Sequence, residues 1–184
     1  MGKNIIVIAS GRSGSTSLTV AIGKQLRKQA IFEPYDYGKG NVYKNKLIKH
    51  ILYDYGGAEQ LKESIEKDDK VILLTRNNIM NVYESFNYTR HNLEVSFHQP
   101  YYYDIEEPVD QSIFDRAVEQ HEAIKQLSKD LDIPYLVYEE LYTKDFVSFN
   151  KSVDKIGLNL DREILKQDLD IKKKYRKNKP LDLI

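Results

Sequence analysis

The sequence predicts an α/β protein in which a central, mostly parallel β-sheet is covered by helices on both faces, as a three-layer sandwich. Short apolar, β-branched runs, typical of strands buried on both faces, alternate with longer segments whose apolar residues recur at helical spacing. Strands that alternate with helices in this way build a parallel sheet. The length of 184 residues fits one domain of ordinary size, so we expect residues 1–184 to form a single domain.

The expected elements follow in order from the N-terminus. The strongest strand predictions are 5–10 and 70–75, which contain the continuous apolar runs 5–9 and 71–74. Three shorter strands are predicted at 31–34, 46–53 and 134–138. Helices are predicted at 16–29, 58–67, 78–92, 110–131, 145–157 and 161–169. In residues 93–109 the apolar residues recur at neither helical nor strand spacing, and this segment is expected to form a loop or lid. The basic end of the chain is expected to be irregular.

The composition excludes several classes of protein. Lys plus Arg and Asp plus Glu both number 28, so no overall field attracts nucleic acid, and no nucleic-acid partner is expected. The absence of cysteine excludes disulfides, thiolate metal sites and cysteine nucleophiles. No apolar stretch reaches the ~18 to 20 residues of a membrane span. The residues before the first strand do not read as a secretory signal, and we expect a cytoplasmic protein.

A loop rich in glycine and hydroxyl residues joins the first predicted strand to the first predicted helix. Residues 10–18 read SGRSGSTSL. The N–H groups and positive dipole end of a helix N-terminus form an anion site, and Gly11 and Gly14 let a ligand approach the backbone closely. Arg12 adds a planar fork of donors, and hydroxyl donors are available from Ser13, Ser15, Thr16 and Ser17. The sequence predicts a phosphate-binding loop, with an ordinary capped strand-to-helix turn as the alternative.

This loop does not fit the pattern of nucleoside triphosphatases. That pattern, G-x-x-x-x-G-K-[ST], places a lysine directly before the Ser or Thr. Gly11 and Gly14 are too close together, and no lysine precedes Ser15 or Thr16. Without that lysine, little neutralises the charge that develops on a γ-phosphate. A P-loop kinase acting on a small molecule or nucleotide is therefore the weaker alternative.

Two segments together resemble a known family. One is SGRSGSTSL, and the other is VILLTRNNIMNVYESF at 71–86. They are similar, in this order, to the 5′-phosphosulfate-binding loop and the 3′-phosphate-binding segment of the sulfotransferases, whose donor is 3′-phosphoadenosine 5′-phosphosulfate (PAPS). In the second segment the family has an arginine at the strand end and a serine eight or nine residues later, which here are Arg76 and Ser85. Weaker similarities follow in family order at FEPYDY (32–37), YLVYEEL (135–141) and KIGLNL (155–160).

The resemblance implies a fold like that of the P-loop NTPases and a sulfuryl transfer that needs no metal. It places Arg12 at the bridging oxygen and 5′-phosphate of PAPS, with a cradle formed by Ser13, Gly14, Ser15, Thr16 and Ser17. It assigns the 3′-phosphate to Arg76 and Ser85. Basic residues near the C-terminus, such as Lys173, would reach the same phosphate, unless they form a solvated tail.

Sulfuryl transfer also needs a base for the acceptor hydroxyl. The resemblance favours Glu33, which matches a glutamate that several family branches use; the alternative for Glu33 is a cap or ion pair at a strand end. The rival base is His50, with Lys49 beside it, because one branch uses a lysine and a histidine. There one residue separates the two, whereas Lys49 and His50 are adjacent and are expected to face opposite sides of a strand. The other histidines, expected at the surface or in packing, are His91, His98 and His121.

The acceptor stays open at this point. It is expected to bear a hydroxyl group, as a sugar, a lipid, a small alcohol, a phenol or a tyrosine does. Specificity is expected from 36–57 and 87–110. The aromatic faces of 101–103 would either stack on sugars or rings or pack within the lid itself. The chain is short compared with the family it resembles, so we expect a part of the acceptor wall to be missing or to be supplied by a second subunit, which leaves a homodimer open. A non-catalytic nucleotide-binding module is the alternative from another class.

Overall fold

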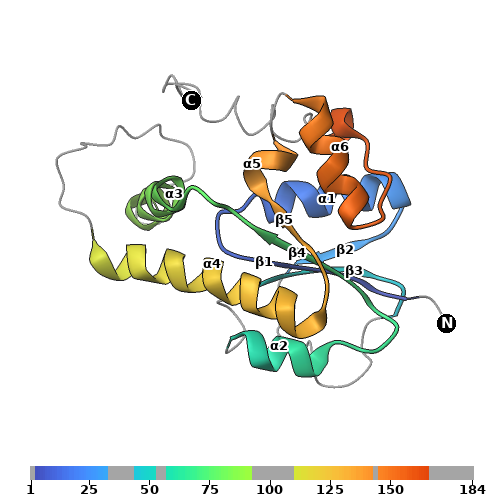
Figure 1. Cartoon of the computed structure of the whole chain (residues 1–184), viewed down its shortest axis with the longest axis horizontal. Coiled ribbons are helices and arrows are strands. Elements are labelled where there is room, and N and C mark those ends of the chain that lie inside the picture. Colours follow the sequence, from blue (N-terminus) through green and yellow to red (C-terminus); the bar gives the residue numbers. More distant parts are fainter. Residues whose placement is uncertain (1–2, 33–43, 53–56, 93–109, 143–144, 166–184) are drawn as a thin grey trace.

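The architecture is a five-stranded parallel β-sheet with helices packed on both faces (Figure 1). The computed structural model describes residues 3–32, 44–52, 57–92, 110–142 and 145–165. The strands are β1 (Ile5–Ala9), β2 (Ala30–Phe32), β3 (Leu47–Ile51), β4 (Lys70–Thr75) and β5 (Tyr135–Val137). Every pair of neighbouring strands is parallel, in the order β2-β3-β1-β4-β5. The predicted α/β class is confirmed.

Apart from the short helix at Tyr138–Leu141, which the sequence did not predict, the helices follow the predicted order along the chain. They are α1 (Ser15–Leu26), α2 (Ala58–Ser64), α3 (Ile79–Asn92), α4 (Gln111–Leu131), α5 (Tyr138–Leu141) and α6 (Phe146–Lys155). The prediction for 134–138 ends one residue late, because Tyr138 begins α5. The first helix ends at Leu26 rather than at Gln29, since Arg27 takes a left-handed conformation with φ 51° and caps the helix. Of the predicted helix at 161–169, residues 162–165 are described and helical, and the predicted loop at 93–109 lies outside the described residues.

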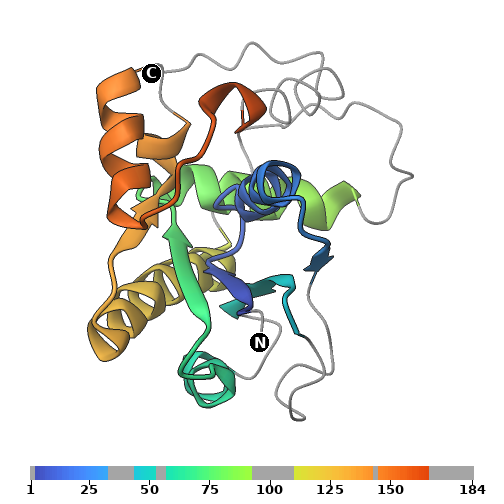
Figure 2. The same ribbon diagram turned by 90° about the vertical axis from the view of Figure 1, so that its right-hand side faces the viewer.

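Two buried clusters fill the space on the two faces of the sheet. Alternate residues of β1 point to opposite faces. Val7 and Ala9 pack with Leu18 and Ile22 of α1 and with residues of α6. On the other face Ile6 and Ile8 pack with α2 and α4, through Leu61, Ile124 and Leu127. Figure 2 shows α1 and α6 on one side of the sheet and α2 and α4 on the other, which gives three layers.

The strand order places a switch point at β1. The chain first forms β2 and β3 on one side of β1 and then crosses to form β4 and β5 on the other. In open α/β sheets, ligands bind outside the carboxyl ends of the strands at the point where the strand order reverses. The loop that follows β1 lies at this point. Figure 1 shows α3 and α5 at the same end of the sheet, where they follow β4 and β5.

Among the described residues no helix is both long enough and apolar enough to cross a bilayer.

Candidate anion-binding site

The loop between β1 and α1 has two left-handed residues close together. Arg12 has φ 61° and Gly14 has φ 78°. Backbone turns with left-handed residues make concavities in which N–H groups face an anion. Gly14 is the N-cap of α1 and gives the helix no side-chain cap. The first helical hydrogen bond runs from the Leu18 N–H to the Gly14 carbonyl, so the N–H groups of 15–17 precede the first helical bond.

The hydroxyl groups of the loop divide into inner and outer ones. The Ser13 hydroxyl donates to the Ser10 carbonyl over 2.7 Å, inside the loop. Ser15 and Ser17 are also buried, whereas Thr16 is exposed. Of the four hydroxyl residues predicted to line a phosphate cradle, Thr16 is therefore the one whose side chain reaches solvent.

A lysine reaches the start of α1 from another strand. The Nζ of Lys49 in β3 donates to the Thr16 hydroxyl over 3.2 Å and lies 5.6 Å from the centre of the Phe32 ring. Lys49 is opposite Val7 in the sheet, on the face that carries α1. The sequence therefore lacks a lysine within the loop, but the fold brings one beside it.

His50 points to the other face of the sheet. It is opposite Ile8, which packs with α2 and α4. The side chain is fully buried, and burial, together with the nearby charge of Lys49, lowers the pKa of His50 from 6.5 to about 4. As expected from their adjacency, Lys49 and His50 lie on opposite faces, so the fold does not bring His50 to the Lys49 side of the loop.

The buried His50 should make the protein less stable in acid. Because the pKa of His50 is lower in the folded protein than in the unfolded chain, the unfolded chain takes up the proton first, and stability falls as the pH drops from about 6.5 to about 4. We expect His50 to cost about 2 kcal/mol of unfolding free energy between pH 7 and pH 5. Urea unfolding at several pH values measures it. His50→Leu should have a shallower slope over this range, and an unchanged slope would contradict the argument.

Helix α3 packs against the loop through Phe86. A Cβ atom at Gly11 would lie 2.4 Å from the Phe86 Cζ, so only glycine fits there without a shift of that ring. The Arg12 guanidinium carbon lies 5.8 Å from the centre of the same ring. Ser85, half-buried, precedes Phe86 on α3. The second resembling segment therefore contacts the first, through a residue that the sequence analysis did not single out.

Helix α4, on the face of the sheet opposite to α1, contacts the loop through Gln120. The Gly11 N–H donates to Gln120 Oε1 over 2.6 Å. His121 Nδ1 lies 2.9 Å from the Thr75 hydroxyl, which lies 3.2 Å from the Ser10 hydroxyl. His121 is buried, and burial lowers its pKa. Of the two expectations for His121, packing is confirmed and surface exposure is wrong.

Arg76 directly follows the last residue of β4, and its side chain contacts two consecutive residues of α5. Its guanidinium carbon is 4.3 Å from the centre of the Tyr138 ring. Its Nε is 3.7 Å from Glu139 Oε1. The Glu139 carboxylate also accepts the N–H groups of Asn77 and Asn78, over 3.0 and 2.9 Å, at the start of α3. Arg76 is thus a half-buried, oriented cation.

The tyrosines of the α5 region pack on the loop itself. The Tyr142 hydroxyl donates to the Gly14 carbonyl over 2.8 Å. A Cβ atom at Gly14 would lie 2.8 Å from the Tyr142 ring and 2.9 Å from the Tyr138 ring. The two rings lie 4.5 Å apart between centres. Tyr138 therefore contacts both the loop and Arg76, a role that the YLVYEEL segment did not reveal by itself.

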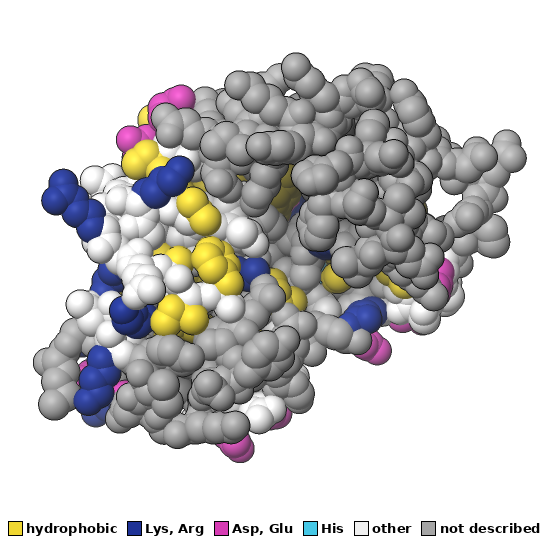
Figure 3. Space-filling model, turned by 180° about the vertical axis from the view of Figure 1, so that it is seen from behind, with side chains coloured by type: hydrophobic (Ala, Val, Ile, Leu, Met, Phe, Trp, Pro, Cys, Tyr) yellow, Lys and Arg dark blue, Asp and Glu magenta, His cyan; other side chains and the backbone are white. Residues whose placement is uncertain are grey.

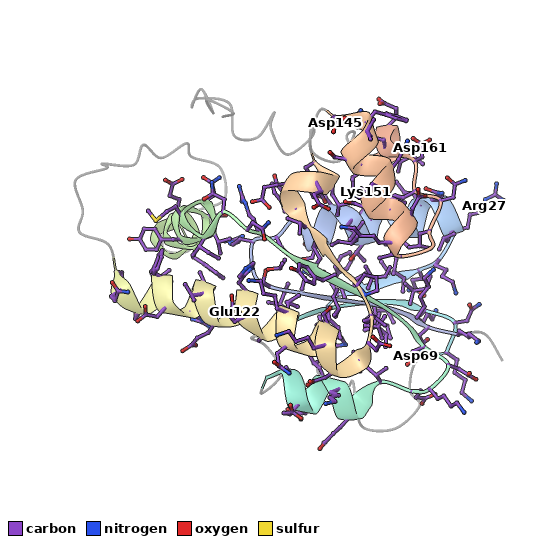
Figure 4. The ribbon with its side chains drawn as sticks, viewed as in Figure 1. Arg27, Asp69, Glu122, Asp145, Lys151 and Asp161 are labelled. Carbon is purple, nitrogen blue, oxygen red and sulfur yellow. The ribbon has the colours of Figure 1, made fainter. Side chains whose placement is uncertain are left out.

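Figure 3 shows hydrophobic side chains beside Lys and Arg side chains on one face, and no histidine among the described residues there, in keeping with the burial of His50 and His121. In Figure 4, Arg27 marks the end of α1 opposite to the loop. Several predicted residues lie outside the described part of the chain: Glu33, Lys173, His98 and Tyr101–103.

The fold and the site define an α/β protein with a glycine- and hydroxyl-rich loop at the switch point of its parallel sheet, with Arg12, Lys49 and Arg76 around it. No family model matches the chain, and neither a curated protein nor a solved structure matches it significantly.

Proposed function

We propose that the protein is a PAPS-dependent sulfotransferase, with a fold of the P-loop NTPase type, that transfers a sulfuryl group to an acceptor hydroxyl. One observation carries the proposal: the two segments that resemble the family meet in space. Phe86 of the second segment packs on Gly11 and Arg12 of the first, and Tyr138 contacts both Gly14 and Arg76. A donor that carries a 5′-phosphosulfate and a 3′-phosphate needs two such anion-binding groups at one edge of the sheet.

The charges around the loop suit the proposed reaction. The acceptor oxygen attacks sulfur, the bond between sulfur and the 5′-phosphate oxygen breaks, and 3′-phosphoadenosine 5′-phosphate leaves with the negative charge. Arg12 lies in the loop and Lys49 lies beside it, and both would stabilise this charge. The hydroxyl proton passes to a base, for which Glu33 is the proposal, and Arg76 and Ser85 would hold the 3′-phosphate.

Calorimetric titration with 3′-phosphoadenosine 5′-phosphate tests the proposed donor site. We expect saturable binding with one nucleotide per chain, followed by transfer of labelled sulfate from PAPS to members of a panel of sugars, lipids, small alcohols and tyrosine peptides. Absence of binding at ~1 mM nucleotide would overturn the proposal, because that limit already corresponds to a weak complex. Tight binding without transfer to any acceptor would favour a non-catalytic nucleotide-binding module.

The position of Lys49 supports a second candidate, a P-loop kinase. A kinase loop uses a lysine amine near its hydroxyl residues to neutralise the transferred phosphoryl group. Lys49 Nζ, hydrogen-bonded to Thr16, supplies such an amine from β3. The kinase predicts magnesium-dependent turnover of ATP that EDTA abolishes, whereas sulfuryl transfer from PAPS should continue in EDTA.

A further inference from the structure

Helix α5 contacts both parts of the proposed donor site. On one side, the Tyr138 and Tyr142 rings pack against Gly14 of the loop. On the other side, Tyr138 stacks on the guanidinium of Arg76, and Glu139 lies 3.7 Å from Arg76 Nε. The ring of Tyr138 therefore lies between the loop and the arginine.

The Glu139 carboxylate is itself held in place by the backbone. It accepts the N–H groups of Asn77 and Asn78, which directly follow Arg76 in the chain. One carboxylate thus binds the turn that carries Arg76 and lies 3.7 Å from the Nε of the Arg76 guanidinium. Arginine loses much rotational freedom when it is fixed in one orientation, and a partner that fixes it before the ligand arrives removes that cost from binding.

We propose that Glu139 is a positioning residue that fixes Arg76 at a set distance from the loop, so that the protein selects nucleotides with two separate phosphate groups over nucleotides with one. This inference rests on the proposed function and adds the residue that determines its donor selectivity. Glu139 acts through Arg76 and does not touch the ligand. A carboxylate beside an arginine can also compete with a phosphate for it, so the sign of the mutational effect decides between positioning and competition.

Glu139→Gln is the decisive variant, measured by calorimetry with two probes, adenosine 3′,5′-bisphosphate and adenosine 5′-monophosphate. We expect the affinity for the bisphosphate to fall ~10-fold, because Arg76 loses its charged partner. In addition, the amide NH₂ of glutamine cannot accept a hydrogen bond, so either the Asn77 or the Asn78 N–H loses its acceptor. The affinity for the monophosphate should change by less than about twofold, since the loop alone binds it. A purely structural role would lower both affinities together.

Glu140→Gln is the matched control. Glu140 is the next residue of α5, and its carboxylate binds the Ser152 hydroxyl and Lys155 on α6, away from Arg76. This variant removes the same charge from the same short helix. The ratio of the two affinities should stay at the wild-type value in Glu140→Gln.

Each result supports or overturns the inference. Equal losses for both nucleotides, an unchanged ratio, or a higher affinity for the bisphosphate in Glu139→Gln would overturn it while leaving the proposed function intact. If the wild-type protein binds neither nucleotide, both the inference and the proposed function are overturned. If Glu139→Gln does not fold, Glu139→Asp, which keeps the charge but shortens the side chain that reaches Arg76, must show the same selective loss for the inference to hold.

Discussion

Replacing Arg12 with alanine is expected to weaken the binding of 3′-phosphoadenosine 5′-phosphate ~100-fold, because the variant loses charge-assisted hydrogen bonds to a phosphate. Arg12 lies in the left-handed turn of the loop and beside the Phe86 ring. Alanine adopts that turn with a strain similar to that of arginine, since both carry a Cβ atom. The loss should therefore come from the side chain, and calorimetric titration measures it.

Arg27→Ala controls for the change in charge. Arg27 also has a positive φ, 51°, and it caps the far end of α1 (Figure 4). The two variants thus remove one guanidinium each from a left-handed position at opposite ends of the same helix. Arg27→Ala should bind the nucleotide as the wild-type protein does. If the Arg12→Ala variant and the wild-type protein bind the nucleotide with equal affinity, the 5′-phosphate does not bind at this loop.

The strands and helices could be predicted where one physical cause dominates. The runs that form β1 and β4 are continuously apolar because both faces of these strands are buried. The ends of elements depend on other causes. Arg27 stops α1 in a left-handed conformation that usually belongs to glycine, and nothing in the local sequence indicates it. Tyr138 leaves the predicted strand because its ring packs on Gly14 and Arg76, a contact between distant segments.

The site shows the same division between local and distant causes. The loop residues from Gly11 to Ser17 could be predicted because composition and position along the chain are local signals. The sequence names Lys49 as a candidate only because it stands beside His50. Its contact with Thr16, 33 residues away in the sequence, could not be predicted, and neither could the contact of Gln120 with Gly11, 109 residues away. His121 did carry a signal: it follows Ala117 by four residues and precedes Ile124 by three, on the buried face of α4.

Gly14 is the loop residue at which the second large effect is expected, now on stability. An alanine there would adopt φ 78° and bring its Cβ within 2.9 Å of two tyrosine rings. The left-handed conformation costs about 1–2 kcal/mol in a residue with a side chain, and the close contacts add about 1–3 kcal/mol. We expect Gly14→Ala to lower the free energy of unfolding by about 3 kcal/mol, measured by urea denaturation.

Gly157→Ala separates the two causes. Gly157 also has a left-handed backbone, with φ 57°, but a Cβ there would meet only the Lys70 Nζ at 3.8 Å. That variant should lose only the conformational part, about 1 kcal/mol. Equal losses in both variants would mean that the Tyr138 and Tyr142 rings move away at little cost. A larger loss for Gly14→Ala would mean that these rings hold the loop that carries Arg12 in its observed shape.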